Sequence, residues 1–465
     1  MTTLRPSPAG AASYPAGTSS GNASYVTDTS DGETSYRIRT LGLIPAIGQE
    51  EYVGRIVDHR LAPEDFRALA GLARHIGITE EFKRIIDYFA PPAGHTPAGF
   101  RIVLNVEAGG LLQIDLVRNI SYDADGVLRP TNLLFSADSA NPYEIAPAAG
   151  ILANLTCNPA IIYDLFLNNP KANVGAAFKD RDEVMTEIGR ILGPGCDISV
   201  ELNNPFESDF AKLLEEAESF REMLSPWRVV IKVPHTGPVN ADNVGELLTG
   251  DKRLSHRWWE PSTEDAFRGH NLALKLREHG FRVNFTLMFE PHQTQLALQA
   301  KPYFINSFVR HRLAQSTWMR TLLDGYAATK DKSQLVSLRD YMIAADYLAG
   351  SDTDYDLEEC RRMAEQFVSY RGVRTLEGAD GLDSVRHNLR ALRTANLPDT
   401  RLIVCSMNGD MMYPEIDRLL TSDEFADMSR RVVLTAEPSY LARFTSSNQV
   451  ISYQRQFMNA TGGHS

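Results

Sequence analysis

The sequence predicts an α/β protein whose main domain is a closed (β/α)8 barrel, the TIM-barrel architecture. From about residue 131, short apolar runs alternate with amphipathic helical patterns, and eight such runs follow one another. Most runs are continuous in Val, Ile and Leu, which is typical of parallel strands that are covered on both faces. Eight strand–helix units in succession favour closure into a barrel over an open sheet.

Each expected strand is short and apolar, and most are followed by a helical pattern. The strands are Asn132–Ala137, Gly150–Leu155, Asp197–Leu202, Arg228–Val233, Phe281–Met288, Tyr303–Phe308, Arg401–Ser406 and Arg431–Leu434. Ser208–Leu224 and Glu264–His279 are two of the expected helices.

Two connections between strands are long. Residues 237–262 follow the fourth strand, and residues 313–399 follow the sixth, with helices expected over Leu335–Leu348 and Leu357–Tyr370. Because both insertions follow strands, both emerge at the carboxyl end of the barrel, where barrel enzymes build their specificity.

The chain before the barrel divides in two. Residues 1–35 are rich in Ser, Thr, Gly, Ala and Pro, a composition that predicts a disordered tail. Residues 36–130 predict a small α+β region, leaving residues 131–465 for the barrel. In the small region we expect a helix from Ala62 toward His75, a helix over Glu80–Phe89, and a hairpin of Phe100–Val106 and Leu111–Val117 that turns at Gly109-Gly110. This region could be a lid, a dimer surface or a packing element.

Composition excludes several functional classes. The net charge of -12 argues against a general nucleic-acid binder, which needs basic patches. No apolar run approaches the roughly 18 residues of a membrane helix, and no secretory signal is evident, so we expect a cytoplasmic protein without a membrane partner. The oligomeric state stays open, with a homodimer as one option.

The sequence indicates neither a metal nor a cofactor. None of the four cysteines has metal-ligand spacing, and Cys157, Cys196 and Cys405 lie in or beside apolar runs as expected of buried, reduced thiols. Walker, GxGxxG and HExxH motifs are absent.

Lys232 is the strongest chemical signal in the chain. It lies near the carboxyl end of an apolar strand, in RVVIKVPHT. Burial removes water from the ammonium group, so we expect the pKa of Lys232 to fall. A lowered pKa yields the neutral amine that attacks a carbonyl. The alternative is a lysine at a strand end whose amine reaches solvent.

Polar residues recur where the other strands end. They are Asp138, Thr156, Asn158, Glu201, Asn284, Thr286, Asn306 and Ser406. Each buried polar group without a partner costs about 1–3 kcal/mol, so a barrel core would not retain them unpaired. They can hydrogen-bond to one another and to loops, but as a set they predict a shared site around Lys232.

Several segments resemble the transaldolase and fructose-6-phosphate aldolase family. NLTCNPAIIYD (154–164) resembles its TTNP-type turn, CDISVELN (196–203) its acidic third strand, and VVIKVPHT its lysine strand. RVNFTLMFEPHQTQLALQA (282–300) and YFINSFVRHR (303–312) resemble its fifth and sixth strands. The resemblance covers about residues 131–440.

The resemblance implies a Schiff-base enzyme that transfers a dihydroxyacetone-type unit from a ketose donor to an aldehyde acceptor. Lys232 would be the nucleophile, Glu201 would activate the catalytic water with help from Thr286, and Asp138 would be the acid/base. Further residues would bind the sugar substrate: Asn158, Asn284, Asn306, Ser406 and Arg312.

One departure from the family pattern concerns the substrate phosphate. Where the family carries an Ala-Ser-Phe-Arg-type run, this chain has Cys405-Ser406-Met407-Asn408, and asparagine cannot form the bidentate pair of an arginine. Arg310 or Arg312 could replace that arginine. We therefore expect a non-standard substrate, with an aldolase (lyase) as the alternative enzyme and a non-catalytic sugar-binding or regulatory barrel as the alternative of another class.

Two further features have open roles. His235 could tune Lys232 or be an ordinary loop histidine. Trp258-Trp259 could cap the site, form an interface or simply pack.

Overall fold

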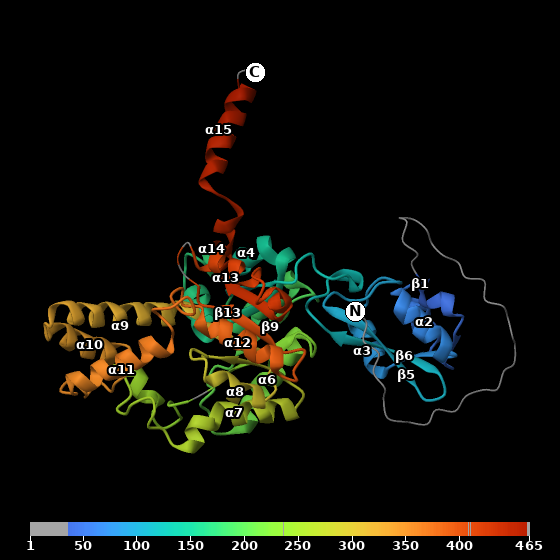
Figure 1. Ribbon diagram of the computed structural model, residues 1–465. Helices are drawn as coiled ribbons and strands as arrows, with labels where there is room; N and C mark the ends of the chain where they lie inside the picture. Colours follow the sequence, from blue (N-terminus) through green and yellow to red (C-terminus); the bar gives the residue numbers. More distant parts are fainter. Residues whose placement is uncertain (1–35, 236, 408, 410, 463–465) are drawn as a thin grey trace. The chain divides into compact units, whose positions relative to one another are not determined.

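Eight parallel strands of the chain hydrogen-bond in sequence order, and the last pairs with the first, so the sheet closes into a barrel (Figure 1). The strands are β7 (Leu134–Asp138), β8 (Leu152–Cys157), β9 (Asp197–Glu201), β10 (Val229–Pro234), β11 (Arg282–Thr286), β12 (Phe304–Phe308), β13 (Arg401–Cys405) and β14 (Val432–Ala436). The predicted (β/α)8 barrel is confirmed, and each strand lies within three residues of its expected bounds.

The structure is a computed structural model that describes residues 36–235, 237–407, 409 and 411–462. The predicted disordered tail, residues 1–35, lies outside the described residues. The described chain forms two compact units. One contains the residues up to Pro130 together with Gly193–Cys196, and the other contains Thr131–Leu192 and the chain from Asp197 onward.

The first unit is a small α+β fold. Its strands are β1 (Tyr36–Arg37), β2 (Ile44–Pro45), β3 (Arg60–Leu61), β4 (His75–Ile78), β5 (Phe100–Glu107) and β6 (Leu111–Arg118), and its helices are α1 (Glu50–Ile56), α2 (Pro63–Leu72) and α3 (Glu80–Phe89). The antiparallel hairpin β5–β6 forms as predicted and belongs to a four-stranded sheet of order β2-β4-β6-β5. Thr79 caps α3 because its hydroxyl accepts from the backbone N–H of Phe82.

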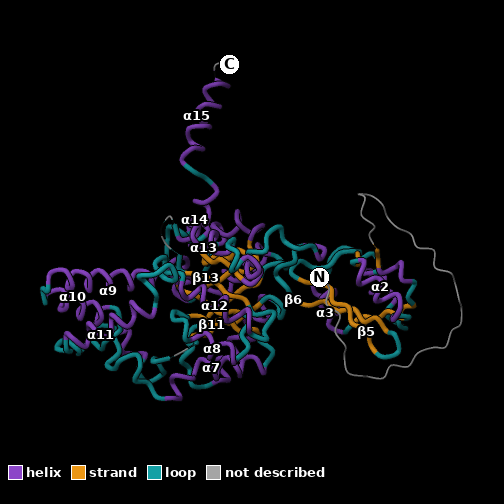
Figure 2. The backbone as a smooth tube through the Cα atoms, viewed as in Figure 1, coloured by secondary structure: helices purple, strands orange, loops and turns teal. Residues whose placement is uncertain are grey.

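Helices follow the barrel strands along the chain, and Figure 2 shows them around the central strands. They are α4 (Pro142–Ile145), α5 (Arg181–Leu192), α6 (Phe210–Leu224), α7 (Thr263–Glu278), α8 (Gln293–Gln299), α12 (Asp383–Thr394), α13 (Met412–Leu420) and α14 (Pro438–Ala442). Asp209 caps α6 and Ser262 caps α7, each through a side-chain oxygen that accepts from a backbone N–H of the first turn. The last helix, α15 (Asn448–Gly462), buries none of its residues.

The insertion between β12 and β13 forms three packed helices, α9 (Val309–Thr329), α10 (Ser333–Ala344) and α11 (Leu357–Tyr370) (Figure 1). These helices share a hydrophobic core of their own, which includes Met319, Leu338, Met342 and Cys360, all fully buried. The two predicted helices are present, but the insertion begins as a 21-residue helix directly after β12.

Candidate active site

A cavity of about 270 Å³ lies where the barrel strands end. All eight barrel strands contribute residues to its walls. The lining consists of Asp138, Thr156, Asn158, Ile161, Glu201, Lys232, Thr286, Leu287, Asn306, Phe308, Arg310, His311, Ile403, Cys405, Ser406, Met407, Thr435, Ala436 and Glu437. The strand-end residues that the sequence singled out therefore meet around one space, with Asn284 and Arg312 outside its lining.

Lys232 is held between its two neighbouring strands. Its register partners are Glu201 on β9 and Asn284 on β11. The Lys232 Nζ atom lies 3.3 Å from Oε2 of Glu201 and donates a 3.2 Å hydrogen bond to the carbonyl oxygen of Cys157. The lysine is 5 % exposed, so its amine faces the cavity and not bulk water.

The expectation that the pKa of Lys232 falls is wrong. Burial does lower the pKa of this amine, but the negative charges of Glu201 and Asp138 outweigh it and raise the pKa above its ordinary value. The strand sequence alone predicts only the loss of hydration. The two carboxylates come from strands distant in sequence, so their effect depends on barrel closure.

Asp138 is the second carboxyl group of the cavity that the sequence predicted. Its Oδ1 accepts a 2.9 Å hydrogen bond from the Thr156 hydroxyl, its register partner on β8. Burial raises the pKa of Asp138, although Lys232 and the Thr156 hydroxyl lower it, and Glu437 raises it further. A carboxyl group with a raised pKa exchanges protons more readily near neutral pH.

The predicted amide residues occupy different positions. Asn306 lines the cavity, and its Nδ2 donates a 2.6 Å hydrogen bond to Oδ1 of Asn284. Asn284 is fully buried beside Lys232, and its Nδ2 has no hydrogen-bond partner among the described residues. The Asn158 side chain lines the cavity and also accepts from the backbone N–H of Ile161, which begins a π-helical turn.

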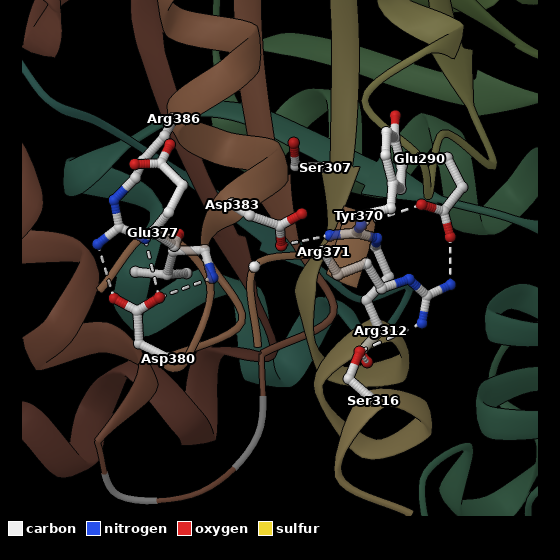
Figure 3. Close-up of polar contacts among 12 residues, drawn as sticks. Glu290, Ser307, Arg312, Ser316, Tyr370, Arg371, Glu377, Asp380, Asp383 and Arg386 are labelled. Atoms are coloured by element: carbon white, nitrogen blue, oxygen red, sulfur yellow. Dashed lines mark hydrogen bonds and ion pairs between the residues drawn. The ribbon is translucent and has the colours of Figure 1, made fainter. Parts of the chain in front are cut away.

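Arg312 does not reach the cavity. Its guanidinium forms ion pairs of 2.9 Å with Glu290 and 2.5 Å with Asp383, and it is 1 % exposed (Figure 3). Glu290 also pairs with Arg371 from the end of α11. Of the two arginines that the sequence offered as replacements, Arg310 is the one that lines the cavity.

Several cavity residues were not predicted. Three of them, Leu287, Phe308 and Glu437, lie at or directly after the ends of barrel strands. Asp138 was predicted from its position at a strand end, and the same criterion could have identified these three. Leu287 and Ser406 both have positive φ, of 54° and 56°, which is uncommon outside glycine and concentrates at functional sites. His311 faces Ser406, with its Nδ1 3.1 Å from the serine hydroxyl. Asn408 lies outside the described residues.

The two features with open roles lie away from Lys232. His235 is buried against Phe285 at a ring distance of 4.7 Å, and neither residue lines the cavity. Trp258 and Trp259 line a second, separate groove.

The fold and the cavity define a (β/α)8-barrel protein with a buried lysine between strand-end carboxylates. Residues 135–380, more than half of the chain, match the family model described as Transaldolase/Fructose-6-phosphate aldolase. The chain therefore belongs to this family and is an enzyme of the transaldolase or aldolase type. A comparison with curated proteins found no match.

Two other kinds of feature are absent from the part of the chain that the structure describes. No helix among the described residues is long and apolar enough to cross a membrane. Within the same residues, no three His, Cys, Asp or Glu side chains group in a way that could hold a metal ion.

Proposed function

We propose that the enzyme uses Lys232 as a Schiff-base nucleophile to transfer a dihydroxyacetone-type unit from a ketose to an aldehyde. The observation that carries the proposal is the placement of one buried amine 3.3 Å from the carboxylate of Glu201, in a cavity that Asp138 also lines. A barrel that only bound sugars would gain nothing from desolvating these three ionisable groups together.

The first stage of the reaction is imine formation. The pKa of Lys232 is raised, so its ammonium must first release a proton, and Glu201 is the carboxylate in direct contact with it. The neutral amine attacks the ketose carbonyl carbon and forms a carbinolamine. A protonated leaving hydroxyl then departs as water, and the product is an iminium ion on Lys232.

The second stage breaks and remakes a carbon–carbon bond. Asp138 accepts the proton of the ketose hydroxyl next to the scissile bond, that bond breaks, and the electron pair passes into the iminium to give an enamine. The released aldehyde leaves. The enamine then attacks an acceptor aldehyde, Asp138 returns the proton to the new alkoxide, and hydrolysis of the imine frees Lys232.

The substrate-binding roles follow from the cavity wall. Asn158, Asn306 and Thr286 present hydrogen-bonding groups for the hydroxyls of the donor or for the catalytic water, and the unpartnered Nδ2 of Asn284 lies beside the lysine. Arg310 and Ser406 replace Arg312 as the groups that would bind an anionic end of the substrate.

Borohydride trapping tests the proposal. The enzyme is incubated with dihydroxyacetone or fructose 6-phosphate, reduced with sodium borohydride, and mapped by peptide mass spectrometry. We expect a reduced adduct on Lys232 that is absent from Lys232→Met. A chain that forms no adduct with either ketose would support the non-catalytic alternative.

The lyase alternative differs in its need for an acceptor. A transferase keeps the dihydroxyacetone unit on Lys232 until an acceptor aldehyde takes it up into a new ketose, so it releases little free dihydroxyacetone with or without the acceptor. A simple aldolase protonates the enamine, hydrolyses the imine and releases free dihydroxyacetone without any acceptor. Measuring product formation with and without glyceraldehyde separates the two.

A further inference from the structure

A second concave site, which we call the aromatic groove, lies on the insertions of the barrel. It has a volume of about 380 Å³ and is lined by Trp258, Trp259, His292, Met363, Gln366, Phe367 and Tyr370. Its residues come from the segment after β10, the segment after β11 and helix α11 of the insertion after β12. All three segments follow strands, so the groove lies at the same end of the barrel as Lys232.

The groove is held in shape by contacts between the two insertions. Arg257, next to the tryptophans, forms a bidentate pair with Asp352, in which both N–O distances are 2.9 Å. Arg253 binds Asp346 at 2.5 Å and donates to the carbonyl oxygen of Ile343 at 2.6 Å. Because these arginines join residues more than 90 positions apart, the walls of the groove are fixed relative to each other.

The third wall is anchored by the buried ion pairs of Figure 3. Tyr370 precedes Arg371, whose guanidinium is paired with Glu290, and Glu290 lies two residues before His292 of the groove. The Tyr370 hydroxyl also lies 3.4 Å from Nδ1 of His292. A partner that binds here therefore meets a preformed surface, which reduces the entropic cost of binding.

The chemistry of the lining selects an uncharged, flat ligand. Trp258 and Trp259 pack edge to face with their ring centroids 5.5 Å apart. This arrangement leaves a ring face available for a ligand to stack on, next to the edge of the other ring. No Lys, Arg, Asp or Glu is among the lining residues. A phosphate or carboxylate would find no counter-charge in this lining, whereas an aromatic ring would bury its faces against the aromatic side chains.

The size of the groove favours a small group over a protein segment. Its volume is within the range of small-molecule pockets, about 300–1,000 Å³. A helix of about 10 Å diameter, such as α15 of a second copy, would need a longer and wider trough.

The groove begins close to the catalytic cavity. Phe289 packs on two residues of the cavity wall, Phe308 at 4.8 Å and His311 at 6.0 Å between ring centroids. Phe289 is three residues before His292, and three residues span at most about 10 Å. The short segment after β11 therefore connects the wall of the catalytic cavity, at Leu287, to the wall of the aromatic groove, at His292.

We propose that the aromatic groove binds the non-reacting part of the acceptor, so that the acceptor is an aldehyde that carries an uncharged aromatic group. This inference rests on the proposed transfer reaction. The donor loses one carbon–carbon bond and the aldehyde carbon of the acceptor gains one, so no oxidant or reductant is required.

The first measurement is binding of an unreactive probe. 3-Phenyl-1-propanol, which cannot form an imine, is titrated into the whole enzyme by calorimetry. We expect saturable binding that weakens at least tenfold in Trp258→Ala and in Tyr370→Ala, two exposed positions whose loss leaves the core intact. The matched control is Trp318→Ala, an exposed tryptophan on α9 that lies outside the groove lining. Absence of saturable binding, or equal binding by all variants, overturns the proposal.

The second measurement is turnover with a series of acceptors. With fructose 6-phosphate as donor, glyceraldehyde is compared with phenylacetaldehyde, 3-phenylpropanal and 5-phenylpentanal. We expect one phenyl aldehyde to exceed glyceraldehyde at least tenfold in kcat/KM, and this ratio to fall at least tenfold in Trp258→Ala. Equal kcat/KM values for all acceptors would overturn the acceptor role even if the probe binds.

The two inferences fail in different ways. If borohydride traps no adduct on Lys232, the transfer reaction and the acceptor role fall together, and probe binding shows only a ligand site. If Lys232 is trapped but the phenyl group gives no advantage, the transfer reaction stands and the groove assignment fails. Probe affinity that declines with rising protein concentration would indicate a second copy in the groove and would also overturn the proposal.

Discussion

Glu201 and Lys232 are register partners on adjacent strands, and their Oε2 and Nζ atoms lie 3.3 Å apart. Lys232 is buried, and its side chain cannot leave the barrel mouth without breaking this contact and its hydrogen bond to Cys157. The pair therefore contributes to stability as well as to the proposed chemistry.

Lys232→Met should destabilise the protein. The substitution leaves the Glu201 carboxylate, whose side chain is 15 % exposed, without its counter-charge. Breaking a fully buried ion pair in this way costs about 3–5 kcal/mol, and the partial exposure of Glu201 reduces that cost. In Lys232→Met/Glu201→Gln the carboxylate is also gone, so much of the loss should be recovered. Urea denaturation of the wild type, both single variants and the double variant measures the coupling. Additive effects of the two substitutions would contradict the pairing.

Asp138→Asn should separate imine formation from carbon–carbon chemistry. The amide keeps the shape of the carboxyl group but cannot accept the hydroxyl proton, so turnover should fall about 10²- to 10⁴-fold. Borohydride trapping of dihydroxyacetone on Lys232 should persist. Turnover at the wild-type rate would refute the assigned role.

The same variant should be more stable than the wild type at neutral pH. The pKa of Asp138 is raised in the folded protein, so its ionised form is disfavoured by folding. Its contribution to stability is present below the unfolded pKa and is lost as the pH rises through the folded pKa. The extra stability of Asp138→Asn over the wild type should therefore be greatest above the folded-state pKa of Asp138 and should shrink in acid. Unfolding free energies at pH 7.5 and pH 4 test this sign.

Arg310 and Arg312 should differ in what their substitution changes. Arg310 lines the cavity, so Arg310→Ala should raise KM for a phosphorylated donor about tenfold while leaving stability nearly unchanged. Arg312→Met removes the partner of Glu290 and Asp383 and should cost about 3 kcal/mol of stability or more. Steady-state kinetics with thermal denaturation distinguishes the two roles. A selective KM effect of Arg312→Met in a fully stable protein would reverse the assignment.

His235 should make the fold sensitive to mild acid. Burial, together with a smaller contribution from the nearby His270, lowers the pKa of His235 from its ordinary value of 6.5 to about 4. Between these values the unfolded chain binds a proton that the folded chain does not, so stability falls as the pH decreases. The loss at pH 5 should be about 2 kcal/mol.

His235→Phe keeps the aromatic packing on Phe285 and removes the titrating group. Chemical denaturation at pH 7.5 and pH 5.0 should show a smaller drop in the variant than in the wild type. An unchanged drop would assign the acid sensitivity to other groups.

Local sequence signals predicted the elements that depend on local physics. Helix α3 has its predicted bounds, Glu80–Phe89, because Thr79 caps it and its apolar residues fall on one face. The barrel strands were found because continuous apolar runs mark strands that are buried on both faces. The two-residue strands β1, β2 and β3 carry no such pattern and were missed.

Long-range electrostatics could not be predicted from the sequence. Arg312 is 22 positions from Glu290 and 71 from Asp383, and nothing in its own segment indicates either partner. The pKa of Lys232 was predicted in the wrong direction for the same reason. In both cases the sequence found the residue and its segment of the chain, and only the folded barrel determines its neighbours.

The three-helix insertion has a hydrophobic core separate from that of the barrel. Substitutions on α11 can therefore accumulate without disturbing the strands that hold Lys232, Glu201 and Asp138. Evolution can vary which molecules this enzyme accepts while the bond-making machinery stays constant. An engineer can use the same independence by randomising α11 and the segment before α7 to obtain new acceptors from an unaltered catalytic barrel.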